Sequence, residues 1–395
     1  MQGYINRFAV RSAACYNRGV KRLFLFFLLG SICLFGCAGD DGSETKPAAS
    51  YQTMQNVSLD AGFDTVITLV EQTDRPDLFS EHFEAMCEEF RKYNALFDIY
   101  NDYEGINNLK TVNDNAGIRP VECDPELIEL LEKAKDFYEL SDGAFDITMG
   151  ALLNVWHNYR TEGIALNEKG EYGSLPSEEE LQEAYAHRGF EYLEIDSEHN
   201  TVFITDPDVR LDVGGIAKGF AAEKAARMLE EAGVDHAAIN AGGNNRTIGV
   251  KADGSTWNVG IQHPDDSGAL IIVQISGTNS FVTSGDYERF YIAEDGKRYQ
   301  HIIDPATCCP ADHYRSVTII TPDSGDADCL STALTVCSIE NGKALLEAYQ
   351  NKTGNPADAI WILNEADASE TEYSHTVPGY FIVYTEGLEG RIVWG

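Results

Sequence analysis

The chain has 395 residues, 43% of them hydrophobic, and its 29 Lys and Arg against 64 Asp and Glu give a net charge of −35. Five of those cations and none of the acids precede Cys37, so the rest of the chain carries a net charge of −40. So acidic a surface excludes nucleic-acid binding through the bulk field, and an anionic ligand needs local help from a helix N-terminus, a lysine or a divalent cation. Acidity that only maintains solubility is the alternative interpretation.

The N-terminus predicts an export signal. A basic segment ending at Lys21-Arg22 precedes an apolar run from Leu23 to Phe35. Because this run is shorter than the ~18 apolar residues needed to span a bilayer, it favours a signal peptide over a transmembrane helix. Leu34-Phe35-Gly36-Cys37 resembles a bacterial lipobox, which implies residues 1–37 as a lipoprotein signal, a lipid on Cys37 and a location on the extracytoplasmic face of the cell membrane. A cleaved signal without lipid is the alternative.

The rest of the chain predicts a flexible, polar tether at 38–55 and one large domain at 56–395. In chain order, we expect a strand at 63–70, helices at 78–97, 125–139 and 147–156, a hairpin at 190–195 and 201–205, and a helix at 215–232. Strands at 236–241, 245–250, 257–262, 269–276, 288–293 and 316–321, helices at 327–337 and 341–351, and strands at 359–364 and 379–384 follow. Because strands and helices mix without strict alternation, an α+β fold with mixed or antiparallel sheets and flanking helices is favoured over a doubly wound fold.

Residues 211–219, Leu-Asp-Val-Gly-Gly-Ile-Ala-Lys-Gly, open the most amphipathic predicted helix. The glycine pair lets the backbone approach a ligand, and the helix start offers unpaired N–H groups and a positive dipole end. Lys218 adds a charge one turn in, so this segment predicts a site for phosphate oxygens, although helices also begin after Gly-Gly for packing reasons. Asp212 would repel phosphate and better suits a hydroxyl, a ring nitrogen or an N-cap.

A second candidate lies in the predicted helix at 327–337. Asp328, Ser331 and Thr332 lie on one face of that helix. A carboxylate and two hydroxyls offer only oxygen ligands, which suits a hard cation such as Mg²⁺ rather than zinc. The alternative is that Asp328 only begins the helix, where a carboxylate is favoured by the dipole.

Two further segments carry candidate residues. His301 stands just before the turn at Asp304-Pro305, where a histidine can act as a general base near neutral pH or serve a structural role. Asp142 and Asp146 flank a Gly-Ala-Phe turn. Their carboxylates could cap the following helix or hold a polar heterocycle against the Phe145 ring.

Together, and in this order, these segments resemble the ApbE family of FAD:protein FMN transferases over about residues 57–365. The matching stretches are Asp142-Gly143-Ala144-Phe145-Asp146 with Trp156; Asp212-Val213-Gly214-Gly215-Ile216-Ala217-Lys218-Gly219; Asn240-Ala241-Gly242-Gly243; Thr283-Ser284-Gly285-Asp286; His301-Ile302-Ile303-Asp304-Pro305; and Ala327-Asp328 with Leu330-Ser331-Thr332.

The resemblance implies an enzyme that binds FAD and Mg²⁺. It would move the FMN half of FAD onto a threonine or serine hydroxyl of an acceptor redox protein and release AMP. By position, the residues implied to contact FAD are Phe63, Tyr100, Ala144, Phe145, Asp146, Asp212, Lys218 and Ile302. Those implied to hold magnesium are Asp328, Ser331 and Thr332, with a backbone carbonyl between Gly215 and Ala217, and His301 resembles the base that deprotonates the incoming hydroxyl. The nucleophile belongs to the acceptor, so no Ser-His-Asp arrangement is expected in this chain.

The chain departs from the family pattern at two turns. Phe63-Asp64-Thr65 stands where the family often has Met-Gly-Thr, and Thr307-Cys308 stands where Thr-Gly is usual. Asp64 could alter the flavin pocket, and if the second turn needs a positive φ, cysteine suits it poorly. Hydrolysis of FAD to FMN and AMP, and flavin binding by a lipoprotein without catalysis, are the alternative functions.

Overall fold

The computed structural model describes residues 50–369 and 371–394. The predicted signal peptide, Cys37 and residues 38–49 lie outside that range. β1 (Gln52–Ser58) begins inside the predicted tether, so the boundary at residue 55 is wrong and the folded domain starts no later than Gln52. Across the described range, no helix combines the length and apolar character needed to cross a membrane.

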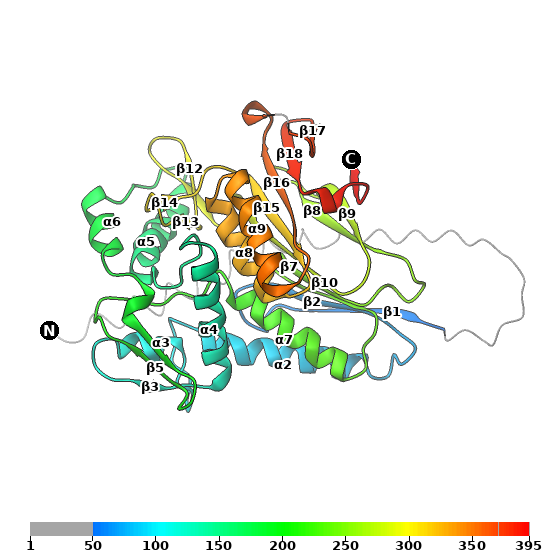
Figure 1. The fold of residues 1–395 in the computed structure, drawn as a ribbon, viewed down its shortest axis with the longest axis horizontal. Helices are drawn as coiled ribbons and strands as arrows, with labels where there is room; N and C mark the ends of the chain where they lie inside the picture. The colour runs from blue at the N-terminus through cyan, green and yellow to red at the C-terminus, as the bar shows by residue number, and fades with distance from the viewer. Residues whose placement is uncertain (1–49, 370, 395) are drawn as a thin grey trace, which may run out of the picture.

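A nine-stranded sheet runs through the centre of the molecule (Figure 1). Every neighbouring pair of its strands is antiparallel. The spatial order is β1, β2 (Ile67–Thr73), β6 (Ala237–Ala241), β7 (Asn244–Ile248), β10 (Asn279–Gly285), β15 (Ser316–Thr321), β16 (Asp358–Asn364), β18 (Tyr380–Tyr384) and β17 (Ser374–Val377). Gly285 pairs with Ser316, so residues 286–315 leave the sheet at the end of β10 and return beside it at the start of β15.

Helices cover one face of this sheet and a smaller sheet covers the other (Figure 1). The helices that share one core with the sheet are α2 (Phe79–Phe97), α3 (Leu109–Asp114), α4 (Pro125–Leu140), α7 (Ala217–Glu231), α8 (Ser324–Val336) and α9 (Ile339–Thr353), whereas α5 (Gly150–Asn167) and α6 (Glu178–Tyr185) pack in a separate core. The smaller sheets join β8 (Trp257–Gln262), β9 (Ala269–Ile275) and β19 (Ile392–Trp394), and β3 (Val121–Glu122), β5 (Thr201–Ile204) and β4 (Leu193–Asp196). Two hairpins pair β11 (Phe290–Ile292) with β12 (Arg298–Gln300), and β13 (Ile303–Asp304) with β14 (Cys309–Pro310).

Alternating side chains separate the two main cores. Along β16, Ala359 and Trp361 face the helical core, while Ile360 and Ile362 face the core shared with β8 and β9, as the two-residue period of a strand requires. Facing the helical side, α2 buries residues spaced three and four apart, including Phe79, Phe83, Met86 and Phe90. A third core joins α5 and α6 to residues 286–315 through Trp156 and Tyr291.

The predicted α+β class with antiparallel sheets and flanking helices is confirmed. The main differences lie at element boundaries. β2 begins only at Ile67, because Phe63 and Asp64 adopt positive φ angles of 57° and 48° and cannot extend the strand. The helix predicted at 147–156 begins instead at Gly150 and runs to Asn167. Most importantly, Thr283-Ser284-Gly285 ends β10, a central strand that the sequence analysis does not predict.

Candidate active site

The start of α7 and the middle of α8 are in close contact. The Gly219 amide donates to Oδ2 of Asp328 at 2.8 Å. A Cβ on Gly219 would overlap the Ser324 carbonyl oxygen and lie 2.6 Å from Cβ of Asp328. Glycine is therefore required here by the approach of two helices, and its absent side chain brings the predicted phosphate loop to the predicted metal ligands.

Asp328 does not begin its helix. α8 starts at Ser324 and Asp323 caps it, accepting a 2.9 Å bond from the Asp326 amide. The alternative interpretation of Asp328 as a helix-starting residue is therefore wrong. Asp328 lies one turn inside α8, 4% exposed, and its carboxylate faces the start of α7.

Three of the groups predicted to bind magnesium lie in this contact region between α7 and α8. In a regular helix the Gly219 amide would donate to the Gly215 carbonyl. Here it donates to Asp328 instead, so Gly219 does not occupy that carbonyl. Oγ1 of Thr332 would lie 3.0 Å from a Cβ on Gly215, which places this hydroxyl against the loop. Asp328, Thr332 and the Gly215 carbonyl would offer the oxygen-only ligands that Mg²⁺ prefers.

Of the remaining predicted metal ligands, Ser331 uses its hydroxyl within the protein, and Ala217 is the first residue of α7. The Ser331 hydroxyl is fully buried, donating to the Asp328 carbonyl at 3.0 Å and lying 2.9 Å from Oγ of Ser284. This bond ties α8 to the end of β10, so Ser331 connects the predicted metal site to the sheet. The Ala217 amide is bonded to the Val213 carbonyl, within the turn that starts α7.

Asp212 organises the loop and is not the helix N-cap. Its Oδ1 accepts from the Gly214 amide at 2.8 Å, whereas Ile216 occupies the N-cap of α7 without a side-chain cap bond. Burial raises the pKa of Asp212, and the Gly214 amide, His157 and Arg160 oppose that rise. The half-buried carboxylate therefore lies near the Arg160 and Arg289 guanidinium groups.

Three cations lie near enough to His301 to affect its charge state. Burial lowers its pKa well below 6.5, and Arg289, Arg160 and Lys218 lower it further. Its Nδ1 is buried without a hydrogen-bond partner in the described structure. The imidazole is therefore neutral at pH 7 and has an unused ring nitrogen, the state a proton acceptor needs.

Arg289 is placed beside His301 by strand register. β11 and β12 pair Phe290 with Gln300, so the next residues outward, Arg289 and His301, lie side by side at the open end of that hairpin. Arg160 reaches the same region from α5, where its Nη2 lies 3.3 Å from Nδ1 of His157. The sequence analysis missed Arg289, Arg160 and His157. The only signal for His157 and Arg160 is that they follow the matched Trp156 in the chain, by one and four residues.

The aromatic residues predicted to contact FAD lie on both sides of this region. The exposed Tyr100 ring lies 5.7 Å from the His157 ring, and Asp212 and Arg160 are among the charges acting on its hydroxyl. Phe145, 2% exposed, lies on the other side with its ring edge against Gly215. The loop from 212 to 218 therefore lies near both the buried Phe145 ring and the exposed Tyr100 ring.

Three other predicted contacts differ in how available they are. Phe63 is half-buried and packs on Phe90 with ring centroids 6.2 Å apart. Ala144 is half-buried in the turn before Phe145, and Ile302 is 8% exposed next to His301.

The Asp146 carboxylate is used internally. Its Oδ1 accepts from the amide and hydroxyl of Thr148 at 2.8 and 2.6 Å, and its Oδ2 pairs with Arg188 at 3.2 Å. The side chain is 0% exposed. The structure therefore places Asp146 in a network that shapes the turn, not at an open surface. It does not cap α5 either, because Met149 is the N-cap and has no side-chain cap bond.

Both departures from the family pattern keep a left-handed backbone. Cys308, 4% exposed, has φ of 60°, its amide donates to the Asp304 carbonyl at 2.9 Å, and its carbonyl accepts from the Trp156 indole at 2.8 Å. Asp64 likewise has φ of 48°. Non-glycine residues thus occupy both turns in strained conformations, fixed by the surrounding contacts.

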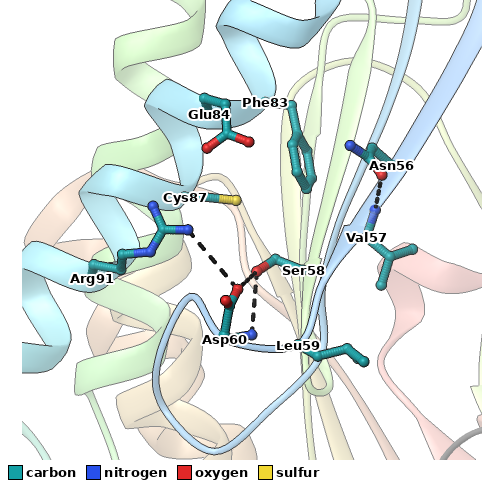
Figure 2. Close-up of a pocket in the computed structure, with 9 residues that line it drawn as sticks. All are labelled: Asn56, Val57, Ser58, Leu59, Asp60, Phe83, Glu84, Cys87 and Arg91. Atoms are coloured by element: carbon teal, nitrogen blue, oxygen red, sulfur yellow. Dashed lines mark hydrogen bonds and ion pairs between the residues drawn. The ribbon is translucent and has the colours of Figure 1, made fainter.

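A separate open hollow of about 490 Å³ lies between β1 and α2 (Figure 2). Its lining includes Cys87, with Asp60 and Arg91 3.9 Å apart at one side. None of the predicted site residues lines it.

Comparison with known proteins agrees with these motifs. The model of the ApbE family matches residues 62–354. A FAD:protein FMN transferase of Treponema pallidum is 36% identical over 269 residues, covering 64% of this chain and 70% of that protein. One from Haemophilus influenzae is 32% identical, covering 63% and 70%. The crystal structure of the ApbE protein of Thermotoga maritima matches with a TM-score of 0.67 at 30% identity, covering 82% of this chain and 97% of that one. The flavin transferase ApbE of Vibrio cholerae matches with 0.65 at 25%, covering 87% and 100%.

Proposed function

Because the chain belongs to the ApbE family, we propose that it is a magnesium-dependent FAD:protein FMN transferase that attaches FMN to a threonine or serine hydroxyl of an acceptor redox protein and releases AMP. The observation that carries this proposal is the neutral His301, with its unpartnered nitrogen, among Arg160, Arg289 and Lys218. A binding protein for flavin alone would have no need of a proton acceptor held among cations.

The proposed reaction exchanges the phosphoanhydride bond between the two halves of FAD for a phosphoester bond to the acceptor. His301 takes the proton of the acceptor hydroxyl, and that oxygen forms a bond to the phosphorus of the FMN half of FAD. The bond between this phosphorus and the bridging oxygen breaks, and AMP leaves with that oxygen. The charge of Lys218 attracts the diphosphate oxygens into an otherwise acidic protein.

Asp328, Thr332 and the Gly215 carbonyl would hold the magnesium ion. A divalent cation at this position supplies neutralisation of the charge that builds on the phosphoryl oxygens.

The decisive experiment uses the full chain with membranes from cells that lack its gene. We expect addition of protein, FAD and Mg²⁺ to produce a fluorescent flavin band that survives a denaturing gel, together with one AMP per flavin attached. AMP and free FMN without a fluorescent band would identify FAD hydrolysis instead. Bound FAD with no AMP released would identify a binding protein and refute the transferase proposal.

We also propose that Cys37 carries a lipid that anchors the protein to the extracytoplasmic face of the cell membrane. The support is the lipobox-like Leu34-Phe35-Gly36-Cys37 after a basic and apolar start. Labelled palmitate should enter the wild-type protein and not Cys37→Ala, which should appear in the soluble fraction. Equal labelling of both proteins would contradict the proposal.

A further inference from the structure

Two carboxylates and two guanidinium groups form a cluster where residues 286–315 leave the sheet and return to it. Asp286 accepts from Nε of Arg315 at 3.0 Å and from Nη1 of Arg298 at 3.1 Å. Asp265 accepts two bonds from Arg315, at 2.7 and 2.8 Å, and one from the Tyr380 hydroxyl at 2.5 Å. Asp286 is therefore the carboxylate that joins both arginines through short bonds.

The chain positions of these residues give the cluster its role. Asp286 and Arg315 are the first and last residues of the segment, and the Asp286 amide also donates to the Arg315 carbonyl at 3.0 Å. Arg298 lies inside the segment, at the start of β12, and its guanidinium covers the Phe290 ring at 4.3 Å. The bond from Arg298 to Asp286 therefore fixes the β11–β12 hairpin against the end of β10.

That hairpin carries His301, and β10 carries the link to the predicted metal ligands. His301 directly follows β12, and Arg289 directly precedes β11. Ser284, two residues before Asp286, bonds Ser331 on α8 at 2.9 Å. Asp286 thus lies between the element that holds the proposed base and the element that holds Asp328.

We infer that Asp286 and Arg298 are positioning residues that set the placement of His301 relative to Asp328. The inference rests on the proposed transfer reaction and deepens it. It also explains the fourth residue of Thr283-Ser284-Gly285-Asp286, for which the proposed reaction has no direct use.

Stability alone is a poor explanation for the cluster. Burial raises the pKa of Asp286 although Arg315 and Arg298 oppose that rise. A charge whose desolvation outweighs its pairing contributes little to folding, and such groups can instead specify one geometry. Misplacing a reacting group by about 1 Å can reduce a rate about 100-fold, so a small shift of the hairpin is sufficient to be measured.

The test compares Asp286→Asn and Arg298→Met with a matched control, Asp265→Asn, which removes a carboxylate from the same cluster but leaves both short bonds to Asp286. Rates of AMP release are measured at saturating FAD with a fixed amount of the acceptor-containing membranes, and FAD affinity by quenching of flavin fluorescence. We expect Asp286→Asn and Arg298→Met to lower the rate about 10- to 100-fold. Their Kd for FAD should stay within about threefold, and Arg298→Lys should recover part of the rate. Asp265→Asn should stay within about threefold of wild type in both quantities.

A structural readout makes the test independent of activity. Amide hydrogen exchange of residues 290–301 should accelerate in Asp286→Asn and Arg298→Met, while that of α8 stays unchanged. Unchanged exchange and rate in both variants would overturn the inference, as would a loss in Asp265→Asn equal to theirs. If Asp286→Asn does not fold, Arg298→Met decides the question. A wild-type protein that forms no flavin band would refute the proposed function instead, which separates the two failures.

Discussion

Substituting Gly219 with alanine tests whether the contact between α7 and α8 builds the site. The added Cβ would overlap the Ser324 carbonyl oxygen and lie 2.6 Å from Cβ of Asp328, and ordinary contact begins at 3.4 Å, so the helices must separate by at least about 0.8 Å. Overpacking of this kind costs about 1–3 kcal/mol, and the gain from alanine in a helix is at most about 1 kcal/mol. The substitution should therefore destabilise the protein and move Asp328 away from the Gly215 loop.

Two measurements check this prediction. Thermal unfolding followed by circular dichroism should show a Tm lower by about 1–4 °C. The Mg²⁺ concentration that half-saturates flavin transfer should rise about 10- to 100-fold, because the Gly219 amide orients the Asp328 carboxylate. Gly214→Ala is the matched control, since its new Cβ would meet only Oδ1 of Asp212, at 3.1 Å. An unchanged Tm and Mg²⁺ requirement in Gly219→Ala would refute the packing argument.

Three further changes test other parts of the molecule. Asp328→Asn should lower the transfer rate at least about 100-fold at fixed Mg²⁺, since it removes the charged ligand, and retained transfer on the gel would exclude its metal role. His301→Gln should cost about 10²–10⁴-fold in rate with FAD binding intact. Because its folded pKa lies well below 6.5, the wild-type rate should stay level from about pH 8 to 6.5 and fall only in more acidic buffer. The free energy of unfolding of the wild type should also decrease as pH falls below about 6.5, because the unfolded state then binds a proton that the folded His301 does not. At about pH 5.5, His301→Gln should lose less of its free energy of unfolding than the wild type does. Arg246→Met breaks a buried 2.8 Å pair with Glu223 and should cost about 3–5 kcal/mol in urea unfolding, whereas Arg75→Met, at an exposed pair, should leave the unfolding curve nearly unchanged.

Local pattern predicted most of the secondary structure and the members of the site. The apolar spacing in α2 and α7 and the alternation in β16 reflect which side of each element is buried, and this is written directly in residue order. The segments with His301, Asp212 and Asp328 could be recognised one by one for the same reason. The interpretation of Asp328 as a helix start failed because Asp323, five residues earlier, is an equally good cap, and local signals do not choose between two such residues.

Position in the sequence does not reveal which groups share one space. Arg289 lies beside His301 because β11 pairs with β12. Asp146 is not available to a ligand because Arg188 and Thr148 bind its carboxylate. These facts depend on strand register and on side chains far apart in the chain.

The order of residues thus determined the family, the element types and the chemical groups available, since each depends on neighbours along the chain. Only the folded arrangement decided that a neutral imidazole lies near cations, that Gly219 lets two helices approach closely, and that Asp286 links the hairpin before His301 to the end of β10. Burial and long-range pairing set charge states and distances, and neither quantity exists until distant segments meet.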